Sequence, residues 1–288
     1  PSLVGDPARA RRAPSGTGPF VPREISFGRA ARFDRSDVYW DRARIALDGV
    51  GMGTDGTVWG GELLRVDGAC FERRGHLLPY AVANDAYGAS APWALAAAVL
   101  HWLGRDEDIE RRFAKAKKYE KISEALRGAH DCQPSTSMGR LFDATAGLLG
   151  IARDAAFRGQ GGLLLEGLAE RHGPVTPLTG GWSCADGNLD LRPLFAALAD
   201  ETDPARGAAL FHTTLAAALA DWLRQAAPAG STVVAGGGCL QNQVLGRHLR
   251  SALNESGLHL IEARRMPPND GGLALGQAWI ALQYLMRE

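Results

Sequence analysis

Apolar and polar positions divide the chain into a run of strands, a block of helices and a closing unit in which strands and helices alternate. Three runs of β-branched or alternating apolar residues predict strands at 44–47, 57–66 and 70–77. The two-residue turn Asp67-Gly68 between the last two runs is typical of a hairpin. The pattern therefore predicts an antiparallel meander from residue 44 onward.

Periods of three to four residues predict the helical block, in which proline precedes or opens several of the helices. The predicted helices are 92–103, 105–127, 140–149, 163–172, one from Pro193 and one from Pro204 to Ala227. Residues 1–37 are rich in proline, glycine, alanine and arginine and show no period, which predicts a flexible N-terminal arm before one domain at 38–288.

The closing unit contains strands at 232–235 and 258–262, each followed by a glycine-rich turn and a helix. Glycine between a strand and a helix lets backbone N–H groups approach an anion at the helix N-terminus. Each turn alone, 236–242 or 267–272, is better explained as a plain turn or a helix cap. Two such turns, both at the carboxyl ends of strands, favour a ligand crevice.

Charge and cysteine content exclude several classes of protein. The 32 basic and 32 acidic residues leave no formal net charge, which argues against nucleic acid or an anionic membrane as the main partner. The longest strongly apolar run, near 91–100, is too short to span a bilayer, and no signal-peptide pattern is present. Four scattered cysteines without a C-x-x-C pair predict neither a zinc finger nor a disulfide scaffold. A reduced, cytoplasmic protein is the simplest interpretation.

Candidate chemistry begins at Asp48, which ends a strand ahead of the glycine-rich turn 49–56. This arrangement is typical of the phosphate-facing hairpin of sugar-kinase and actin-like folds, although a mobile hairpin explains it equally well. Asp143 lies on a largely apolar helix, so it is either exposed or paired with a ligand or a backbone amide. His212 fits a packed core histidine better than a base, and Cys239 lacks a neighbouring base. Alternating helices and short strands after the meander predict an α/β fold of ribonuclease H-like type.

Six motifs, in family order over residues 44–283, resemble the C-terminal carbamoyltransferase domain of the hydrogenase maturation family HypF. They are Asp48 to Glu62, Ser137 to Asp143, Gly159-Gln160 with Glu166, Phe211 to Ala216, Gly237 to Asn242 and Pro267 to Gln277. That domain belongs to the actin-like ATPase superfamily and is related to the enzymes that place threonylcarbamoyl on tRNA. The resemblance implies an actin-like (ASKHA) α/β fold, a mixed sheet with flanking helices, with the first lobe largely missing.

The resemblance also implies an activity. In the family, one domain makes carbamoyl-adenylate from carbamoyl phosphate and ATP. The domain resembled here moves the carbamoyl group to the C-terminal cysteine thiolate of the partner HypE, on the way to the cyanide ligands of [NiFe] hydrogenase. Asp48 and Asp270 match catalytic metal ligands. The positions matching nucleotide-binding residues are Gly49, Gly51, Asp143, Gly161, Gly162, Glu166, Gly237, Gly238 and Asn242.

The sequence also departs from the family. The adenylate-forming domain is absent, which implies that a separate domain or protein supplies carbamoyl-adenylate. Residues 25–33 contain no histidine where the family has metal ligands, and Arg158 stands where glutamate is usual. Two carboxylates without imidazoles suit Mg²⁺ bridged by phosphates better than zinc or iron. Two other functions stay open: a catalytically degenerate nucleotide-binding regulator, and an O-carbamoyltransferase acting on another acceptor.

Overall fold

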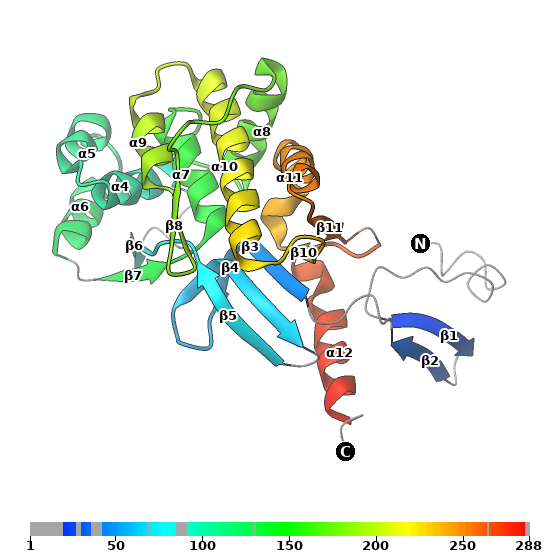
Figure 1. The fold of residues 1–288 in the computed structure, drawn as a ribbon. Helices are drawn as coiled ribbons and strands as arrows, with labels where there is room; N and C mark the ends of the chain where they lie inside the picture. The colour runs from blue at the N-terminus through cyan, green and yellow to red at the C-terminus, as the bar shows by residue number, and fades with distance from the viewer. Residues whose placement is uncertain are drawn as a thin grey trace.

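A seven-stranded mixed sheet forms the framework of the protein (Figure 1). The computed structural model describes residues 20–26, 30–35, 42–67, 70–84, 91–128, 131–263 and 265–285. The strands run in the order β11-β10-β3-β4-β7-β6, and β5 pairs with residues 62–67 of β4. Their bounds are β3 Arg42–Met52, β4 Val58–Asp67, β5 Cys70–His76, β6 Tyr80–Ala83, β7 Cys132–Ser135, β10 Thr232–Gly236 and β11 His259–Glu262.

The predicted meander is confirmed, because β3 pairs antiparallel with β4 and β4 pairs antiparallel with β5. The predicted end of the first strand is wrong. β3 continues past Asp48 to Met52, and its pairing with β4 shifts register between Leu47 and Gly51. A bulge therefore carries Asp48 within the strand, and pairing resumes where Gly51 faces Trp59.

The two strands of the closing unit extend the meander in parallel. β10 lies between β3 and β11 and runs parallel to both. Burial alternates along β10, so that Val233 and Ala235 face the core. The carboxyl ends of β10 and β11 consequently lie at one edge of the sheet, together with the Asp48 bulge of the neighbouring β3.

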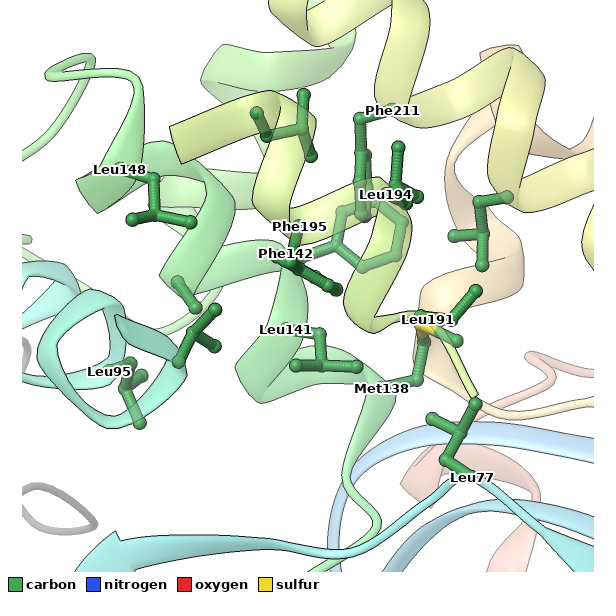
Figure 2. Packing of buried hydrophobic residues seen from close by; sticks show 14 of the residues in the cluster. Leu77, Leu95, Met138, Leu141, Phe142, Leu148, Leu191, Leu194, Phe195 and Phe211 are labelled. Carbon is green, nitrogen blue, oxygen red and sulfur yellow. The ribbon is translucent and has the colours of Figure 1, made fainter. Parts of the chain in front are cut away.

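Helices from the middle of the chain pack together above one face of the sheet (Figure 1). They are α4 Pro92–Trp102, α5 Asp106–Phe113, α6 Tyr119–Gly128, α7 Met138–Leu148, α8 Gln160–His172, α9 Arg192–Asp200, α10 Pro204–Ala226 and α11 Gln243–Glu255. The central helix is α7, whose Leu141 and Phe142 belong to one apolar cluster with Leu95 of α4, Phe195 of α9 and Phe211 of α10 (Figure 2). This apolar packing holds α7 in a defined position over the sheet edge.

The single helix predicted over 105–127 is wrong, because the chain forms α5 and α6 with a turn at 114–118 between them. Lys118 adopts the left-handed region, with φ of 65°, which ends helical propagation there. Phe113 and Ile122, one from each helix, are both buried. No glycine or proline occurs in the turn at 114–118. This turn lets the apolar faces of both α5 and α6 reach the core.

Several short elements were not predicted. Residues of the predicted N-terminal arm form β1 Phe20–Ser26 and β2 Ala30–Arg35, an antiparallel pair, and residues 1–19 lie outside the described part. β6 and β7 at the sheet edge, and the small pair β8 Ser183–Ala185 and β9 Asn188–Asp190, were also missed. These strands have three to seven residues, too few for a clear period.

The last helix, α12 Leu273–Leu285, extends away from the other helices (Figure 1). Large apolar side chains on it are exposed, among them Leu275 and Ile280. Helix α12 has 13 residues. Within the described residues, no helix has the length and apolarity needed to cross a membrane.

Candidate functional site

The Asp48 bulge of β3 and the turns that follow β10 and β11 border a cavity of about 430 Å³, a size typical of small-molecule sites. We call it the site cavity. Five segments surround it: the β3 bulge, the N-terminal half of α7, the start of α8, the glycine turn after β10, and the turn before α12. It is lined by Asp48, Gly139, Arg140, Phe142, Asp143, Arg158, Gly159, Gly162, Leu163, Glu166, Gly238, Cys239, Gln241, Asn242, Asn269 and Asp270.

The β3 bulge and the glycine turn are joined directly. The Gly238 N–H donates to Asp48 Oδ1 at 3.2 Å, which links residues 190 positions apart in sequence. Gly237 lies behind this contact with φ of 106°, and a Cβ there would meet the Leu47 carbonyl oxygen at 2.1 Å. A Cβ at Gly238 would stand 3.3 Å from Asp48 Oδ1. Glycine is thus required at Gly237 by the fold, whereas at Gly238 it leaves space beside the carboxylate.

The turn before α12 completes this wall of the cavity. Its Pro268 carbonyl accepts a hydrogen bond from the Gly237 N–H at 2.6 Å. Asn269 Oδ1 accepts from the Gly271 N–H at 3.0 Å and so caps the short 3-10 turn Asp270–Gly272. Asp270 and Asp48 both line the site cavity, one from the turn after β11 and the other from the bulge in β3, with β10 between these two strands.

The first turn of α7 supplies another part of the wall beside the β3 bulge, because Ser137 Oγ donates to the Asp48 carbonyl at 3.4 Å. Ser137 Oγ accepts from the Arg140 N–H at 3.2 Å and caps the helix. Arg140 Nη1 donates to Asp143 Oδ2 at 3.3 Å. Sequence reasoning left Asp143 either exposed or paired with a ligand or backbone amide, and the structure instead pairs it with Arg140. Gly161 of α8 packs against this pair, since a Cβ there would lie 2.9 Å from Asp143 Oδ1.

Helices α8 and α11 meet at the far end of the cavity. Glu166 Oε1 accepts from the backbone N–H of Gln243 at 2.7 Å, where a carboxylate is favoured at the start of α11. Asn242 caps the same helix, its Oδ1 accepting from the Leu245 N–H at 2.9 Å. The Asn242 amide nitrogen contacts His212 Nε2 at 3.0 Å, and His212 Nδ1 lies 2.7 Å from the Ala208 carbonyl.

Burial governs the titration of these groups. It lowers the pKa of His212 to about 4, so this fully buried imidazole is neutral and is a core histidine, as predicted. Burial raises the pKa of Asp143, and attraction to Arg140 and Arg158 opposes the rise. The pKa of the Cys239 thiol is raised by burial and further by Asp48 and Asp143. Cys239 therefore stays protonated, which makes it a poor nucleophile.

The carboxylates fit a metal only with help from a ligand. Asp48 and Asp270 line one cavity, but among the described residues no three His, Cys, Asp or Glu side chains form a group that could hold a metal. Zinc and iron sites in proteins usually need more ligands of that kind. Mg²⁺ commonly takes one or two carboxylates together with substrate phosphates and water. The residues therefore suit a phosphate-bridged Mg²⁺ and do not suit a tight zinc or iron centre.

The cavity gathers most of the residues that were predicted for the site. Seven line it: Asp48, Asp143, Gly162, Glu166, Gly238, Asn242 and Asp270. Gly161 and Gly237 lie behind its wall, where they allow close packing. Gly51 does not line it and is exposed on the hairpin, because β3 continues beyond Asp48, and the surroundings of Gly49 lie outside the described residues.

Several lining residues were missed, notably Arg140, Phe142, Leu163, Gln241 and Asn269. Arg140 and Phe142 lie inside the motif that contains Asp143, and Gln241 and Asn269 lie in the two glycine turns. Their position within those motifs was a usable signal. Leu163 has no such signal, because a leucine at the start of a helix is ordinarily a core residue.

Comparison with known proteins shows which family profile and which sequences this chain resembles. Residues 44–277 match the sequence profile of the family described as "Carbamoyltransferase, Kae1-like Domain, second subdomain". The chain is 46% identical over 268 residues to carbamoyltransferase HypF2 of Cupriavidus necator, covering 83% of this chain and 33% of that protein. It is 39% identical over 248 residues to carbamoyltransferase HypF of Rhizobium leguminosarum bv. viciae, covering 85% and 32%. The chain thus spans about a third of the length of these two relatives.

Solved structures agree with the sequence matches. The structure of T. kodakarensis HypF superposes with a TM-score of 0.76 at 26% identity, covering 86% of this chain and 34% of that one. A full-length HypF in a phosphate- and nucleotide-bound form superposes with a TM-score of 0.72, also at 26% identity, covering 86% and 40%. The predicted actin-like α/β fold and the predicted resemblance are thereby confirmed.

Proposed function

Because this chain belongs to the carbamoyltransferase family, in which it matches the second subdomain of the Kae1-like domain, we propose that it holds carbamoyl-adenylate and hands the carbamoyl group to a partner's thiolate. The acceptor in this proposal is the C-terminal cysteine of HypE, and the reaction is a step of hydrogenase maturation. A separate domain or protein supplies the carbamoyl-adenylate. The donor, the acceptor and the nucleotide are all parts of the proposal.

One observation carries the proposal. Asp48, Gly238, Asn242 and Asp270, which come from segments far apart in sequence, line one cavity at the carboxyl ends of the strands. Ligands of open α/β sheets bind at this edge. The cavity volume of about 430 Å³ falls in the range of small-molecule sites. The nucleotide-bound relative of known structure supports a nucleotide as the ligand.

The two ends of the cavity suit the two ends of an adenylate. Glu166 and Asn242, which cap α11, offer a carboxylate and an amide for ribose hydroxyls, and Leu163 offers an apolar surface for the base. Gly238 leaves room for phosphate beside Asp48 and Asp270. These two carboxylates repel phosphate unless a cation offsets their charge, and a divalent ion bound to both would supply it.

The proposed reaction transfers the carbamoyl group from the phosphate oxygen of AMP to the sulfur of a thiolate. The thiolate sulfur of the acceptor attacks the carbonyl carbon of the carbamoyl group, the bond from that carbon to the phosphate oxygen breaks, and AMP leaves with the electron pair. The product is a thiocarbamate. The chain contributes positioning of the mixed anhydride and donors for the developing oxyanion. The acceptor thiolate comes from the partner, because Cys239 in the cavity is held protonated.

Mass spectrometry of the HypE C-terminus tests the proposal. The purified chain is mixed with HypE and preformed carbamoyl-adenylate, or with an enzyme that makes carbamoyl-adenylate. We expect carbamoylation of the cysteine only when the chain is present. From carbamoyl phosphate and ATP alone, we expect no pyrophosphate release, because that activation belongs to a different domain in the family.

Two outcomes would contradict the transferase proposal in different ways. If calorimetry shows adenylate binding but the HypE cysteine stays unmodified, a nucleotide-binding regulator is the better description. If the chain binds no adenylate at all, the cavity serves another ligand. Pyrophosphate release by the chain alone would show that it carries an activation site of its own.

A further inference from the structure

The first turn of α7 places a buried cation at the wall of the site cavity. Arg140 is the third residue of the helix, lines the cavity and is only 9% exposed. Such burial is uncommon for an arginine, whose guanidinium is costly to remove from water unless it is well paired. The apolar packing of α7 at Leu141 and Phe142 keeps the side chain in this position (Figure 2).

The guanidinium is incompletely paired. Its Nη1 donates to Asp143 at 3.3 Å, a long contact for a charge-assisted hydrogen bond. Its Nε is buried and has no hydrogen-bond partner among the residues that the structure describes. A guanidinium carries several N–H donors, and a buried donor without an acceptor is destabilising. A ligand oxygen in the cavity that Arg140 lines would give this incompletely paired guanidinium a further acceptor.

The position in the helix strengthens the case for an anion. The N-terminus of a helix carries partial positive charge, so a cation in the first turn is unfavourable and a negative group there is favourable. Arg140 adds its own charge to that end of α7, and Asp143 pairs with it through one long contact of 3.3 Å. An anionic oxygen placed against this turn would be attracted by both the backbone and the side chain.

We propose that Arg140 binds the phosphate of the adenylate through its guanidinium, in the cavity that it lines together with Asp48 and Asp270. The ligand class is a nucleoside monophosphate or its acyl ester. This inference rests on the proposed function and adds the residue that makes the cavity prefer a nucleotide to a nucleoside. Without Arg140, the carboxylates of the cavity would repel the phosphate.

The other arginine of the cavity provides a comparison within the site. Arg158 also lines it, but its side chain is exposed, before the start of α8. An exposed charge is screened by solvent and contributes little to affinity. We therefore expect Arg140, and not Arg158, to set the preference for phosphate.

Calorimetric titration with adenosine and with AMP tests this, because the two ligands differ only by the phosphate. In the wild-type chain we expect tighter binding of AMP. In Arg140→Gln we expect AMP affinity to fall by about tenfold or more, the effect of losing a charge-assisted hydrogen bond. Adenosine affinity should change by less than about twofold, within the scatter of a remote change. Arg140→Lys keeps the charge but not the planar fork, and should lie between the two.

Matched variants separate the possible results. Arg171→Gln removes an exposed arginine of α8 outside the cavity and should leave both affinities unchanged. Arg140→Gln leaves Asp143 buried without its partner, so the double variant with Asp143→Asn serves if the single variant unfolds. A folded double variant that binds adenosine but no longer prefers AMP supports the proposal.

Failure of this inference and of the proposed function would look different. A wild-type chain that binds neither adenosine nor AMP contradicts the nucleotide function itself. A wild-type preference for AMP that persists in Arg140→Gln, or in the double variant, overturns the role of Arg140 and leaves the nucleotide function standing. Loss of that preference in Arg158→Gln alone would assign the phosphate to Arg158 instead.

Discussion

Asn242 and His212 form a buried pair in which the amide nitrogen of Asn242 donates to His212 Nε2 at 3.0 Å. The direction of this bond follows from the other ring nitrogen. His212 Nδ1 contacts the Ala208 carbonyl at 2.7 Å, and a carbonyl only accepts, so Nδ1 carries the proton and Nε2 is the acceptor. His212 thus orients the amide of a residue that both caps α11 and lines the site cavity.

Substitutions of His212 should separate this orienting role from simple packing. In His212→Gln the longer amide can still present an oxygen to Asn242, whereas in His212→Asn it cannot reach. We expect His212→Asn to weaken AMP binding by about fivefold, the loss of one hydrogen bond near 1 kcal/mol, and His212→Gln to retain most of the affinity. Calorimetry on the two variants measures the difference. Equal losses of AMP affinity in the two variants would mean that His212 serves only in packing.

The same histidine should make stability fall in acid. Its pKa is about 4 in the folded chain, below the ordinary value of 6.5, so below pH 6.5 the unfolded state binds the proton more readily. Stability from this group is therefore complete above pH 6.5 and declines as the pH falls toward 4. Between pH 7.5 and 5 the loss is about 2 kcal/mol. Urea unfolding at the two pH values measures it, and the decline should be smaller in His212→Gln.

The neighbouring glycines Gly237 and Gly238 should respond differently to a side chain. At Gly237, a Cβ would strike the Leu47 carbonyl from a φ of 106°, so Gly237→Ala should destabilise the fold by about 3 kcal/mol. At Gly238, the side chain would project toward Asp48 and Asn269. Gly238→Val should therefore leave the helix content unchanged and abolish adenylate binding. Circular dichroism with calorimetry checks both, and unchanged affinity in Gly238→Val would contradict the proposed phosphate position.

The features of this site that depend on local sequence were predicted, whereas those that depend on packing between helices were not. The turns after β10 and β11 were recognised locally from glycine, proline and asparagine. Asp48 and Asp270 were each singled out beside a glycine-rich turn, and both line the cavity although β10 separates β3 from β11. The partner of Asp143 was not predicted, because Arg140 is buried only once α7 docks against Gly161 of α8. Such burial arises from packing between helices, which periodicity does not reveal.

The fold shows the same division. The antiparallel meander and the parallel β10 and β11 had clear apolar runs and were predicted. The turn between α5 and α6 was not, because no glycine or proline interrupts residues 114–118 and tertiary packing overrides a good helical pattern there. The Asp48 bulge was likewise missed, since a register shift depends on pairing with β4.

Glu62, on the interior strand β4, should matter for stability because it holds Thr136 just before α7. Its side chain is 2% exposed and accepts from the Gly60 N–H at 2.7 Å, from Arg73 Nη2 at 3.0 Å and from Thr136. Glu62→Ala leaves the Gly60 N–H and the Thr136 hydroxyl without this acceptor, while Arg73 keeps its pair with Asp55 at 3.1 Å, so it should cost about 2 kcal/mol of unfolding free energy. Glu72→Ala, on the exposed side of the same hairpin, is the matched control and should cost less than about 0.5 kcal/mol. Similar losses in both variants would contradict a special role for burial.

The last prediction concerns Mg²⁺ and whether the Asp270 carboxylate strengthens or weakens AMP binding in its presence and absence. Asp48 and Asp270 line the cavity without a third ligand of metal-binding type among the described residues, so Mg²⁺ should bind weakly alone and more tightly once phosphate is present. In Asp270→Asn without Mg²⁺, AMP should bind about fivefold tighter than in wild type, because one repelling carboxylate is gone. With Mg²⁺ the order should reverse, because the ion has lost a ligand. Calorimetry of AMP in EDTA and in Mg²⁺ gives both values, with Asp154→Asn, an exposed position outside the cavity, as the control.

Weaker AMP binding by Asp270→Asn under both conditions would mean that Asp270 accepts a hydrogen bond from the ligand directly. Stoichiometric zinc or iron in the purified protein, found by elemental analysis, would contradict a phosphate-bridged Mg²⁺, because such ions require ligands beyond these two carboxylates.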